Sequence, residues 1–485
     1  MLRARVDDLV VVVPGILGSR LTDADGHEVW GLSGGALWRG IRTFGGSLRG
    51  LALPAGLGDA HPGDGVRPTG LVSDLHALPG IWNPVDGYSG LLRWLEQHFT
   101  LRARPGGSPG DEPANLFPFA YDWRLSCRYN AEQLKSLLDR ELSRWRESAP
   151  ERRAAKVVFL CHSMGGLVVR HYVERCGGAE TTRRVITLGT PRRGSLDALL
   201  HLVNGLRYGW GPFGVDLTAF ARSLPSLHQL TPDYACLDAP GGLLYARELT
   251  GLPGVDEELL KDAARFHADL REPGAGRGTG TASGEYAGSV EHLVEYLTVS
   301  GVLQPTLTTA EFAGEELVPR TTIDGQDEGG DGRVPRLSAE DGSRPAFTPW
   351  EQHGSLQNNP AVRQAIWGWL GPEPPTHRAG EDGDVPLSVV APEGVAAGAS
   401  YEVTAVIPER VPRHDERVVY AGLVPAGAVG PGMRRTLRNR GGGRYTTSFP
   451  GVAAGAYRTR VEVGGAPHTA VTSLLVVEPE EFGHA

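Results

Sequence analysis

Short apolar runs alternate with longer segments of helical periodicity along the first two thirds of the chain. The short runs are apolar on consecutive residues, as expected for strands that are buried on both faces. Strands of this kind separated by helices predict an α/β fold, in which crossover helices connect a parallel sheet. The predicted strands are residues 9–13, 116–120, 157–160, 185–188 and 296–303, and the predicted helices are residues 91–99, 131–145 and 166–175.

The alternation is interrupted over residues 195–287 by helical pieces punctuated with Gly and Pro and by a polar low-complexity stretch, 272–284. We interpret this segment as a cap inserted over the functional edge of the sheet. Aromatic residues stand among glycines at 206–213, which suits a mobile lid, although a packed cap is the favoured interpretation.

A different pattern follows residue 386. Short strands are separated by turn residues over 387–478, and at 401–407 apolar residues alternate with polar or small ones, the period of a half-buried antiparallel strand. About ninety residues with six or seven such strands predict an immunoglobulin-like β-sandwich. The Pro, Gly and charge-rich stretch 371–386 predicts a linker, so that residues 1–370 form the α/β domain and 387–478 the sandwich.

Composition and charge narrow the classes of protein. The 485 residues are 40% hydrophobic and carry a formal net charge of −9, so a general attraction to nucleic acid is excluded. The four cysteines stand singly, and neither a zinc site nor a disulfide framework is predicted. Because no signal peptide and no spanning apolar run is seen, a cytoplasmic location is expected.

The stretch Cys161-His-Ser-Met-Gly-Gly166 joins a predicted strand to a predicted helix. A serine in a tight turn between a strand and a helix is typical of a nucleophile elbow, where small neighbours let the chain pass. Cys161 stands at the place of the usual first glycine, and a simple helix cap would also fit the fragment. Ser163 is therefore a candidate nucleophile that needs a base, an acid and an oxyanion hole.

His353 is the candidate base. In elbow-type hydrolases an acid and then a histidine follow the serine, and the four histidines after His353 fall in the linker, in the sandwich or beyond it. Asp331, between glycines, is the candidate acid. Asp324, Asp327 and Asp341 stay open as rivals, because an Asp-Gly pair is most often only a turn.

An oxyanion hole requires two backbone N–H groups, one after the nucleophile and one after an early strand. Met164 and Ile16 are the candidates, the latter in a turn at 14–19 that contains Pro and Gly. A turn with Gly-x-x-Gly can also cradle phosphate, but no Gly-Lys-[Ser/Thr] and no G-x-G-x-x-G follows. No nucleotide, metal or other cofactor is predicted.

Seven ordered blocks resemble the lecithin:cholesterol acyltransferase family of α/β-hydrolases, which includes phospholipid:diacylglycerol acyltransferases and a lysosomal phospholipase. The resemblance covers nearly all of residues 9–370. The blocks are 13–21 (VPGILGSRL), 119–124 (FAYDWR), 162–166 (HSMGG), 186–195 (ITLGTPRRGS), 224–230 (LPSLHQL), 330–335 (GDGRVP) and 353–356 (HGSL).

The resemblance implies an α/β-hydrolase fold with an inserted cap, and serine-dependent acyl transfer on lipid esters through an acyl-enzyme. It assigns Ser163 as nucleophile, Asp331 and His353 as its partners, and the amides of Ile16 and Met164 as the oxyanion hole. Either water or an alcohol would then resolve the acyl-enzyme, so a lipase, a phospholipase and an acyltransferase all stay open.

The chain also departs from the family. Arg333 stands where the family usually has a small hydroxyl residue, residues 195–287 match only around Pro225-Ser226, and the sandwich has no counterpart in the best-known members. Substrate choice is therefore the least transferable property.

Tyr121 and Trp123 end a predicted strand at the functional edge, and the indole is a candidate for lining an acyl pocket, although a structural role fits equally. The expected partners are a lipid or other ester and a transient lipid interface, and the sandwich is open to an unknown partner. The competing hypotheses are an esterase or amidase on non-lipid substrates and a non-catalytic binding protein.

Overall fold

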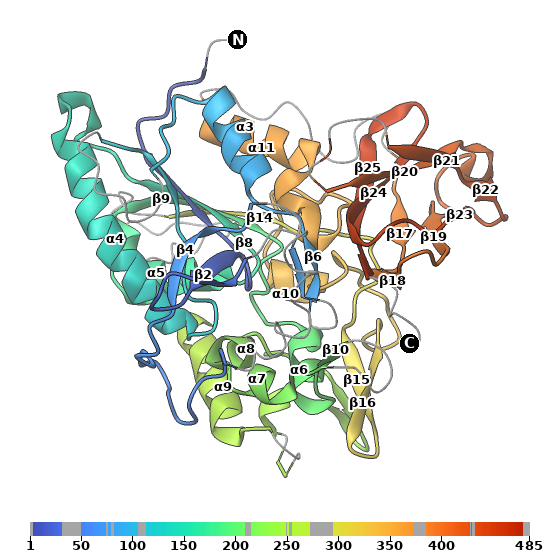
Figure 1. Cartoon of the computed structure of the whole chain (residues 1–485), viewed down its shortest axis with the longest axis horizontal. Coiled ribbons are helices and arrows are strands. Elements are labelled where there is room, and N and C mark those ends of the chain that lie inside the picture. Colours follow the sequence, from blue (N-terminus) through green and yellow to red (C-terminus); the bar gives the residue numbers. More distant parts are fainter. Residues whose placement is uncertain are drawn as a thin grey trace, which may run out of the picture.

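The chain forms two units that lie side by side (Figure 1). The computed structural model describes residues 3–31, 50–73, 76–78, 82–104, 113–208, 215–248, 250–251, 255–271, 294–371, 385–426, 428 and 432–478. Most of the predicted linker, the polar stretch 272–284 and the aromatic residues 209–213 lie outside these described residues.

A parallel sheet forms the centre of the first unit, as the apolar runs predict. Its strands follow the order β14-β9-β8-β1-β7, and every neighbouring pair is parallel. The strand predicted at 296–303 ends at Val299, because the N–H groups of Ser300 and Val302 donate to the carbonyls of Phe347 and Pro349. The strands are β1 (Leu9–Val13), β7 (Leu116–Pro118), β8 (Val157–His162), β9 (Thr182–Leu188) and β14 (Glu295–Val299).

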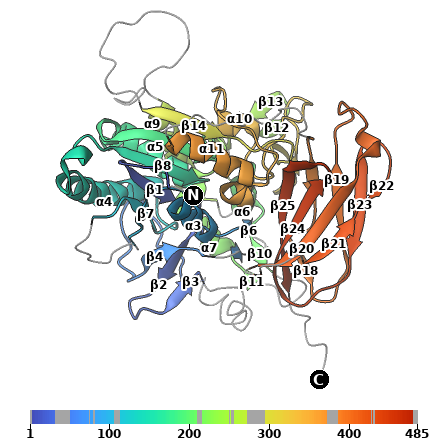
Figure 2. The ribbon, with the colours of Figure 1, turned by 90° about the horizontal axis from the view of Figure 1, so that it is seen from above.

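Helices cover both faces of this sheet (Figure 2). In β1, Leu9, Val11 and Val13 pack into the core under α4 (Cys127–Glu147) and α5 (Gly165–Arg175). The intervening residues of β1 pack into a second core, under α3 (Ser89–His98) and α11 (Pro360–Leu370). This two-sided burial is the reason why the strand sequences are apolar throughout.

The predicted cap segment folds into packed helices and short strands below the sheet in Figure 1. Its helices are α6 (Leu196–Val203), α7 (Thr218–Arg222), α8 (Pro225–Gln229) and α9 (Glu257–Arg271). A small sheet joins it to later residues, in the order β13-β12-β15-β16. Its strands are β12 (Leu237–Ala239), β13 (Gly242–Leu244), β15 (Thr309–Ala313) and β16 (Glu316–Arg320).

Smaller elements complete the first unit. Three short strands form a separate sheet in the order β3-β2-β4, and two pairs of strands stand alone. These strands are β2 (Ser19–Thr22), β3 (Glu28–Trp30), β4 (Arg67–Leu71), β5 (His76–Leu78), β6 (Trp82–Val85), β10 (Arg207–Tyr208) and β11 (Val215–Asp216), and the short helix α10 (Arg336–Glu340) follows β16.

Two sheets enclose one core in the C-terminal unit. One has the order β17-β19-β23-β22 and the other β18-β25-β24-β20-β21. The strand predicted at 401–407 is present as β19, and the described residues of this unit form nine strands where six or seven were predicted. The strands are β17 (Ser388–Val390), β18 (Gly394–Ala396), β19 (Tyr401–Val406), β20 (Val419–Pro425), β21 (Met433–Thr436), β22 (Arg438–Asn439), β23 (Arg444–Phe449), β24 (Gly455–Val463) and β25 (Ala466–Glu478).

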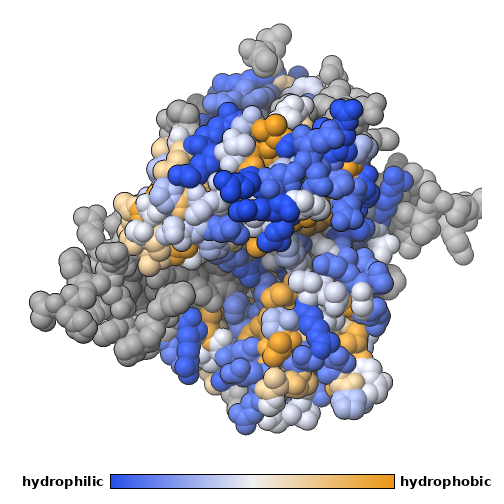
Figure 3. All heavy atoms as spheres, turned by 90° about the vertical axis from the view of Figure 1, so that its right-hand side faces the viewer, coloured by the Kyte–Doolittle hydropathy of each residue, from blue (hydrophilic) through white to orange (hydrophobic). Residues whose placement is uncertain are grey.

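The surface on the side of the C-terminal unit is mainly hydrophilic, and hydrophobic residues appear there in small separate groups (Figure 3). Within the described part of the chain, no helix combines the length and the apolar character that a membrane span requires.

Candidate active site

Ser163 occupies a left-handed turn between β8 and α5, with a φ of 53°. Two glycines make this turn possible. A Cβ atom on Gly165 would lie 2.4 Å from the carbonyl oxygen of Pro14, and one on Gly166 would lie 2.1 Å from Thr190 Oγ1. Cys161 is tolerated at the usual glycine position because its side chain is buried in the core beneath α4 and α5. The local backbone therefore has the strained geometry of a nucleophile elbow.

The structure brings Ser163, His353 and Asp331 together, although up to 190 residues separate them. His353 Nε2 lies 2.9 Å from Ser163 Oγ, and His353 Nδ1 lies 2.8 Å from Asp331 Oδ2. All three residues are buried. With the proton on Nδ1, the imidazole donates to the carboxylate and is free to accept the serine proton.

Hydrogen bonds with the backbone hold Asp331 in place. Its Oδ1 accepts the backbone N–H groups of Arg333, at 3.0 Å, and Val334, at 2.8 Å. Its carbonyl oxygen accepts the N–H of His353 at 2.8 Å, so the acid and the base are also linked through their backbones. Glycine is required nearby, because a Cβ atom on Gly301 would lie 2.5 Å from Asp331 Cβ.

The three rival aspartates do not reach the imidazole. Asp324 and Asp327 are exposed on the preceding loop, and Asp341 faces Arg170 at 3.8 Å. Of the four candidates from the sequence, the structure therefore brings only Asp331 to His353.

A second histidine, His162, lies beside the site, with its ring centroid 4.9 Å from that of His353. Burial and, to a smaller extent, the neighbouring His353 lower the pKa of His162 to about 3, so the ring is neutral. Its Nδ1 lies 2.9 Å from the hydroxyl of Tyr88, and its Nε2 lies 2.9 Å from the carbonyl oxygen of His353. Tyr88 therefore donates to Nδ1, and Nε2–H donates to the carbonyl, so His162 supports the base without being one.

The loop that contains Ile16 is held against Ser163 by two buried tyrosines. The N–H of Gly15 donates to the hydroxyl of Tyr88 at 2.9 Å, and the hydroxyl of Tyr121 donates to the carbonyl of Pro14 at 2.8 Å. A Cβ atom on Gly15 would lie 2.8 Å from Ser163 Cβ, which shows how closely the loop approaches.

Ile16 lines the cavity at Ser163, and Met164 directly follows the serine at the start of α5. Among the described residues, neither amide donates a hydrogen bond. An oxyanion hole requires N–H groups of this kind, which have no acceptor among the described residues.

A cavity of about 50 Å³ opens at Ser163. It is largely apolar, but two charged side chains, Asp197 and Arg333, take part in its wall. Its lining residues are Gly15, Ile16, His162, Ser163, Pro191, Ser195, Asp197, Ala198, Leu230, Arg333, Val334, His353 and Gly354.

Tyr121 and Trp123, the candidates for binding substrate, are not among the residues that line this cavity, and the structural role left open by the sequence fits both. The indole of Trp123 is fully buried, donates to the carbonyl of Ser19 at 3.2 Å and packs edge-on against Trp30. Tyr121 holds Pro14 as described above. Both side chains therefore support the loop of the candidate oxyanion hole, because their polar atoms are bonded to its backbone.

Three contributors to the site were not predicted as site residues, namely Tyr88, His162 and Asp197. His162 directly precedes the serine and was visible within the quoted motif. Tyr88 and Asp197 carry no local signal, because their roles depend on contacts with residues 70 or more positions away. Arg333 stood out in the sequence only as a departure from the family pattern.

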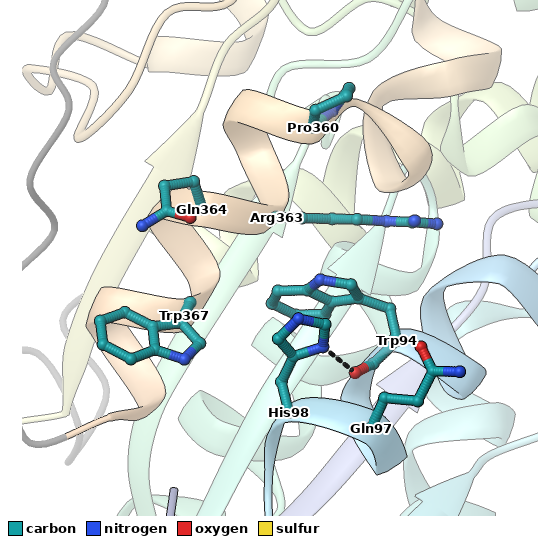
Figure 4. Close-up of a pocket in the computed structure, with 7 residues that line it drawn as sticks. All are labelled: Trp94, Gln97, His98, Pro360, Arg363, Gln364 and Trp367. Atoms are coloured by element: carbon teal, nitrogen blue, oxygen red, sulfur yellow. Dashed lines mark hydrogen bonds between the residues drawn. The ribbon is translucent and has the colours of Figure 1, made fainter. Parts of the chain in front are cut away.

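A larger hollow of about 880 Å³ lies on the outer surface between α3 and α11 (Figure 4). Trp94 stacks on His98 there, with ring centroids 4.8 Å apart, and Trp367 and Arg363 face them from α11. None of the seven residues that line this hollow is a serine, a cysteine or an acid. Ser163 and His353 line the smaller cavity instead, and Asp331 lies behind His353.

The family model of lecithin:cholesterol acyltransferase matches residues 107–237. The matched segment includes Ser163 and Met164, but not Asp331 or His353. The resemblance to this family is thus confirmed, and it supports an enzyme of the esterase or acyltransferase type. No curated protein matches the chain.

Solved structures show only weak likeness. A lipase from Bacillus licheniformis, BlEst2 in its propeptide form, is 11% identical over 97% of this chain and 93% of its own, with a TM-score of 0.31. A putative membrane-anchored protein from Corynebacterium diphtheriae is 18% identical over 19% of this chain and 21% of its own, with a TM-score of 0.16. A superoxide reductase from Ignicoccus hospitalis is 15% identical over 19% and 80%, with a TM-score of 0.15. At these TM-scores the likenesses carry no weight for fold or function.

Proposed function

We propose that the protein is a serine-dependent hydrolase or O-acyltransferase that acts on lipid esters through an acyl-enzyme on Ser163. The observation that carries this proposal is the pair of hydrogen bonds that link Ser163 to His353, at 2.9 Å, and His353 to Asp331, at 2.8 Å. The match to an acyltransferase family supports the lipid ester class.

The proposed reaction has two steps. His353 Nε2 takes the proton of Ser163, whose Oγ attacks the ester carbonyl, while the amides of Ile16 and Met164 stabilise the oxyanion. His353 then returns the proton to the leaving alcohol, and the acyl group stays on Ser163. Water or an acceptor alcohol, deprotonated by His353, attacks the acyl-enzyme and restores the free serine. Asp331 holds the useful tautomer and stabilises the imidazolium.

We also propose an α/β-hydrolase fold for the first unit and an immunoglobulin-like fold for the C-terminal unit. The central parallel sheet, the elbow and the order of serine, acid and histidine support an α/β-hydrolase fold, with 195–287 as its cap. The two facing sheets of residues 387–478 support an immunoglobulin-like sandwich. We further propose a cytoplasmic location and transient contact with a lipid interface.

An esterase on short acyl groups is a second candidate, favoured by the small cavity. About 50 Å³ holds only a few non-hydrogen atoms, since one water needs at least about 10–15 Å³ on this measure. A series of chromogenic esters of increasing acyl length separates the two candidates. A maximum at acetyl or butyryl favours the esterase, and a maximum at long chains favours the lipid enzyme.

Active-site labelling tests the enzyme itself. A fluorophosphonate is expected to label the intact protein and to leave Ser163→Ala unlabelled. Absence of labelling in the folded wild type would favour a non-catalytic binding protein. Incubation with a lipid extract, followed by analysis of free acid and acylated alcohol, then decides between hydrolase and transferase: free acid alone excludes the transferase.

A further inference from the structure

The C-terminal unit rests on the segments that carry Asp331 and His353. Besides an ion pair between Arg458 and Asp86, its contacts with the first unit fall on Arg333, two residues after Asp331, and on Glu351 and Gln352, just before His353. They also include Gln304, whose N–H donates to the carbonyl of Gly330. The contacts are Arg333 Nη2 with Glu393 Oε2, 2.9 Å; Gln304 Nε2 with the Leu387 carbonyl, 3.1 Å; Val389 N with Gln304 Oε1, 3.1 Å; Gln352 Nε2 with the Val389 carbonyl, 3.2 Å; and Thr472 N with Glu351 Oε1, 2.6 Å.

Arg333 is the centre of a chain of three charges. Its Nη1 donates to Asp197 Oδ2 at 3.1 Å, on the cap helix α6, and its Nη2 donates to both oxygens of Glu393, at 3.1 and 2.9 Å, in the C-terminal unit. The Arg333 side chain is 19% exposed and that of Asp197 11%, so the cationic group is largely removed from water. A guanidinium in such a place is stabilised only while its carboxylate partners remain.

Arg333 also stabilises the turn that contains Asp331. The backbone N–H of Arg333 donates to Asp331 Oδ1, and its carbonyl accepts the hydroxyl of Ser195 at 2.7 Å. A shift of Arg333 would therefore change both a hydrogen bond to the Asp331 carboxylate and the lining of the cavity. Because small misplacements of reacting groups lower rates strongly, this position is suited to positioning.

We propose that Arg333 is a positioning residue through which the C-terminal unit, by Glu393, holds the Asp331 turn and the cap helix α6 in their active arrangement. The inference rests on the proposed function. According to this proposal, the C-terminal unit stabilises the active site of its own chain and is needed for full turnover. It also gives a physical reason for an arginine where the resembling family usually has a small hydroxyl residue.

The test compares Glu393→Gln with Glu462→Gln in the full-length chain. Glu393 is half exposed, so its amide variant is expected to fold. Glu462 is a matched control, since it pairs with Arg434 at 3.0 Å within the C-terminal unit. We expect E393Q to lower kcat about five-fold, with KM within about two-fold of wild type, because the charge is lost while the amide oxygen can still accept a hydrogen bond from Arg333. E462Q should keep the wild-type kcat.

A double-mutant cycle with Arg333→Met tests whether Glu393 acts through the arginine. The double variant should then have no lower kcat than R333M alone. Multiplied losses, or an unchanged kcat in E393Q, would overturn the inference. A fall in kcat of the same size in E462Q would overturn it as well, because the effect would then be a general one on the unit.

Amide hydrogen exchange gives a second measurement, which does not depend on turnover. Exchange in residues 329–335 is expected to rise in E393Q, because the amides that hold Asp331 Oδ1 become less protected. If the wild type proves inactive while this exchange still rises, the proposed function fails and the coupling stands. If the wild type is active and both kcat and exchange are unchanged in E393Q, the coupling fails and the proposed function stands.

Discussion

Replacing Asp331 by asparagine is expected to reverse the tautomer of the catalytic imidazole while leaving the fold intact. Oδ1 of the native carboxylate accepts two backbone N–H groups, at 3.0 and 2.8 Å, so the oxygen of an asparagine must take this place. Its NH₂ group then points at His353 Nδ1, which lies 2.8 Å from the present Oδ2. Two donors cannot share that contact, and the ring proton moves to Nε2, where it blocks acceptance of the serine proton.

The magnitude follows from this geometry. A serine enzyme with its histidine in the wrong tautomer loses about 10⁴-fold in kcat, equivalent to about 5 kcal/mol of transition-state stabilisation. The free energy of unfolding should change by less than about 1 kcal/mol, because the two backbone hydrogen bonds at Oδ1 are retained. KM should stay within a few-fold, since Asp331 does not line the cavity.

The assay is hydrolysis of a chromogenic ester by the purified variant, with urea unfolding as the measure of stability. Asp324→Asn is the matched control, because Asp324 is exposed on the same connection and its φ of 49° also suits asparagine. A D331N variant that keeps more than about a tenth of the wild-type kcat would refute the assignment of the acid. So would an equal loss in D324N.

Three further predictions concern the surroundings of the site. Tyr88→Phe leaves the buried N–H of Gly15 without an acceptor, so kcat should fall about ten-fold with little change in KM; an unchanged kcat would contradict the role of this hydroxyl. Gly166→Ala places a Cβ atom 2.1 Å from Thr190 Oγ1 and should lower the free energy of unfolding by about 1–3 kcal/mol, measured by urea melts. Burial raises the pKa of Glu351 from 4.5 to about 7, so this carboxyl ionises at lower pH in the unfolded chain than in the folded one. Stability should therefore fall between these values by up to about 3 kcal/mol and then level off, and Glu351→Gln should lack this dependence.

Local features of the chain determined the α/β class, most strand positions and the candidate nucleophile. A strand covered on both faces must be apolar at consecutive positions, and β1 and β8 show this directly. The elbow is also a local feature, because the glycines that it needs stand within three residues of Ser163. Helix α4 begins before its predicted start because Ser126 caps it, accepting the N–H of Tyr129 at 3.0 Å.

The choice of the acid depended on the tertiary structure. Four aspartates share one stretch of sequence, and each stands beside residues that form turns. Only the fold of the chain shows which carboxylate meets an imidazole, because that contact also requires Gly189 and Gly301 to leave room for it.

The roles of Tyr121, Trp123 and the C-terminal unit were likewise decided by packing over long separations. The sequence predicts an aromatic pair at the functional edge and a sandwich after a linker, but not which surfaces they bury. In the folded chain the aromatic pair holds the loop at 14–19, and the sandwich bonds to the segments of the acid and the base. Periodicity reports whether a residue is buried, whereas the identity of its neighbours is set by contacts between distant parts of the chain.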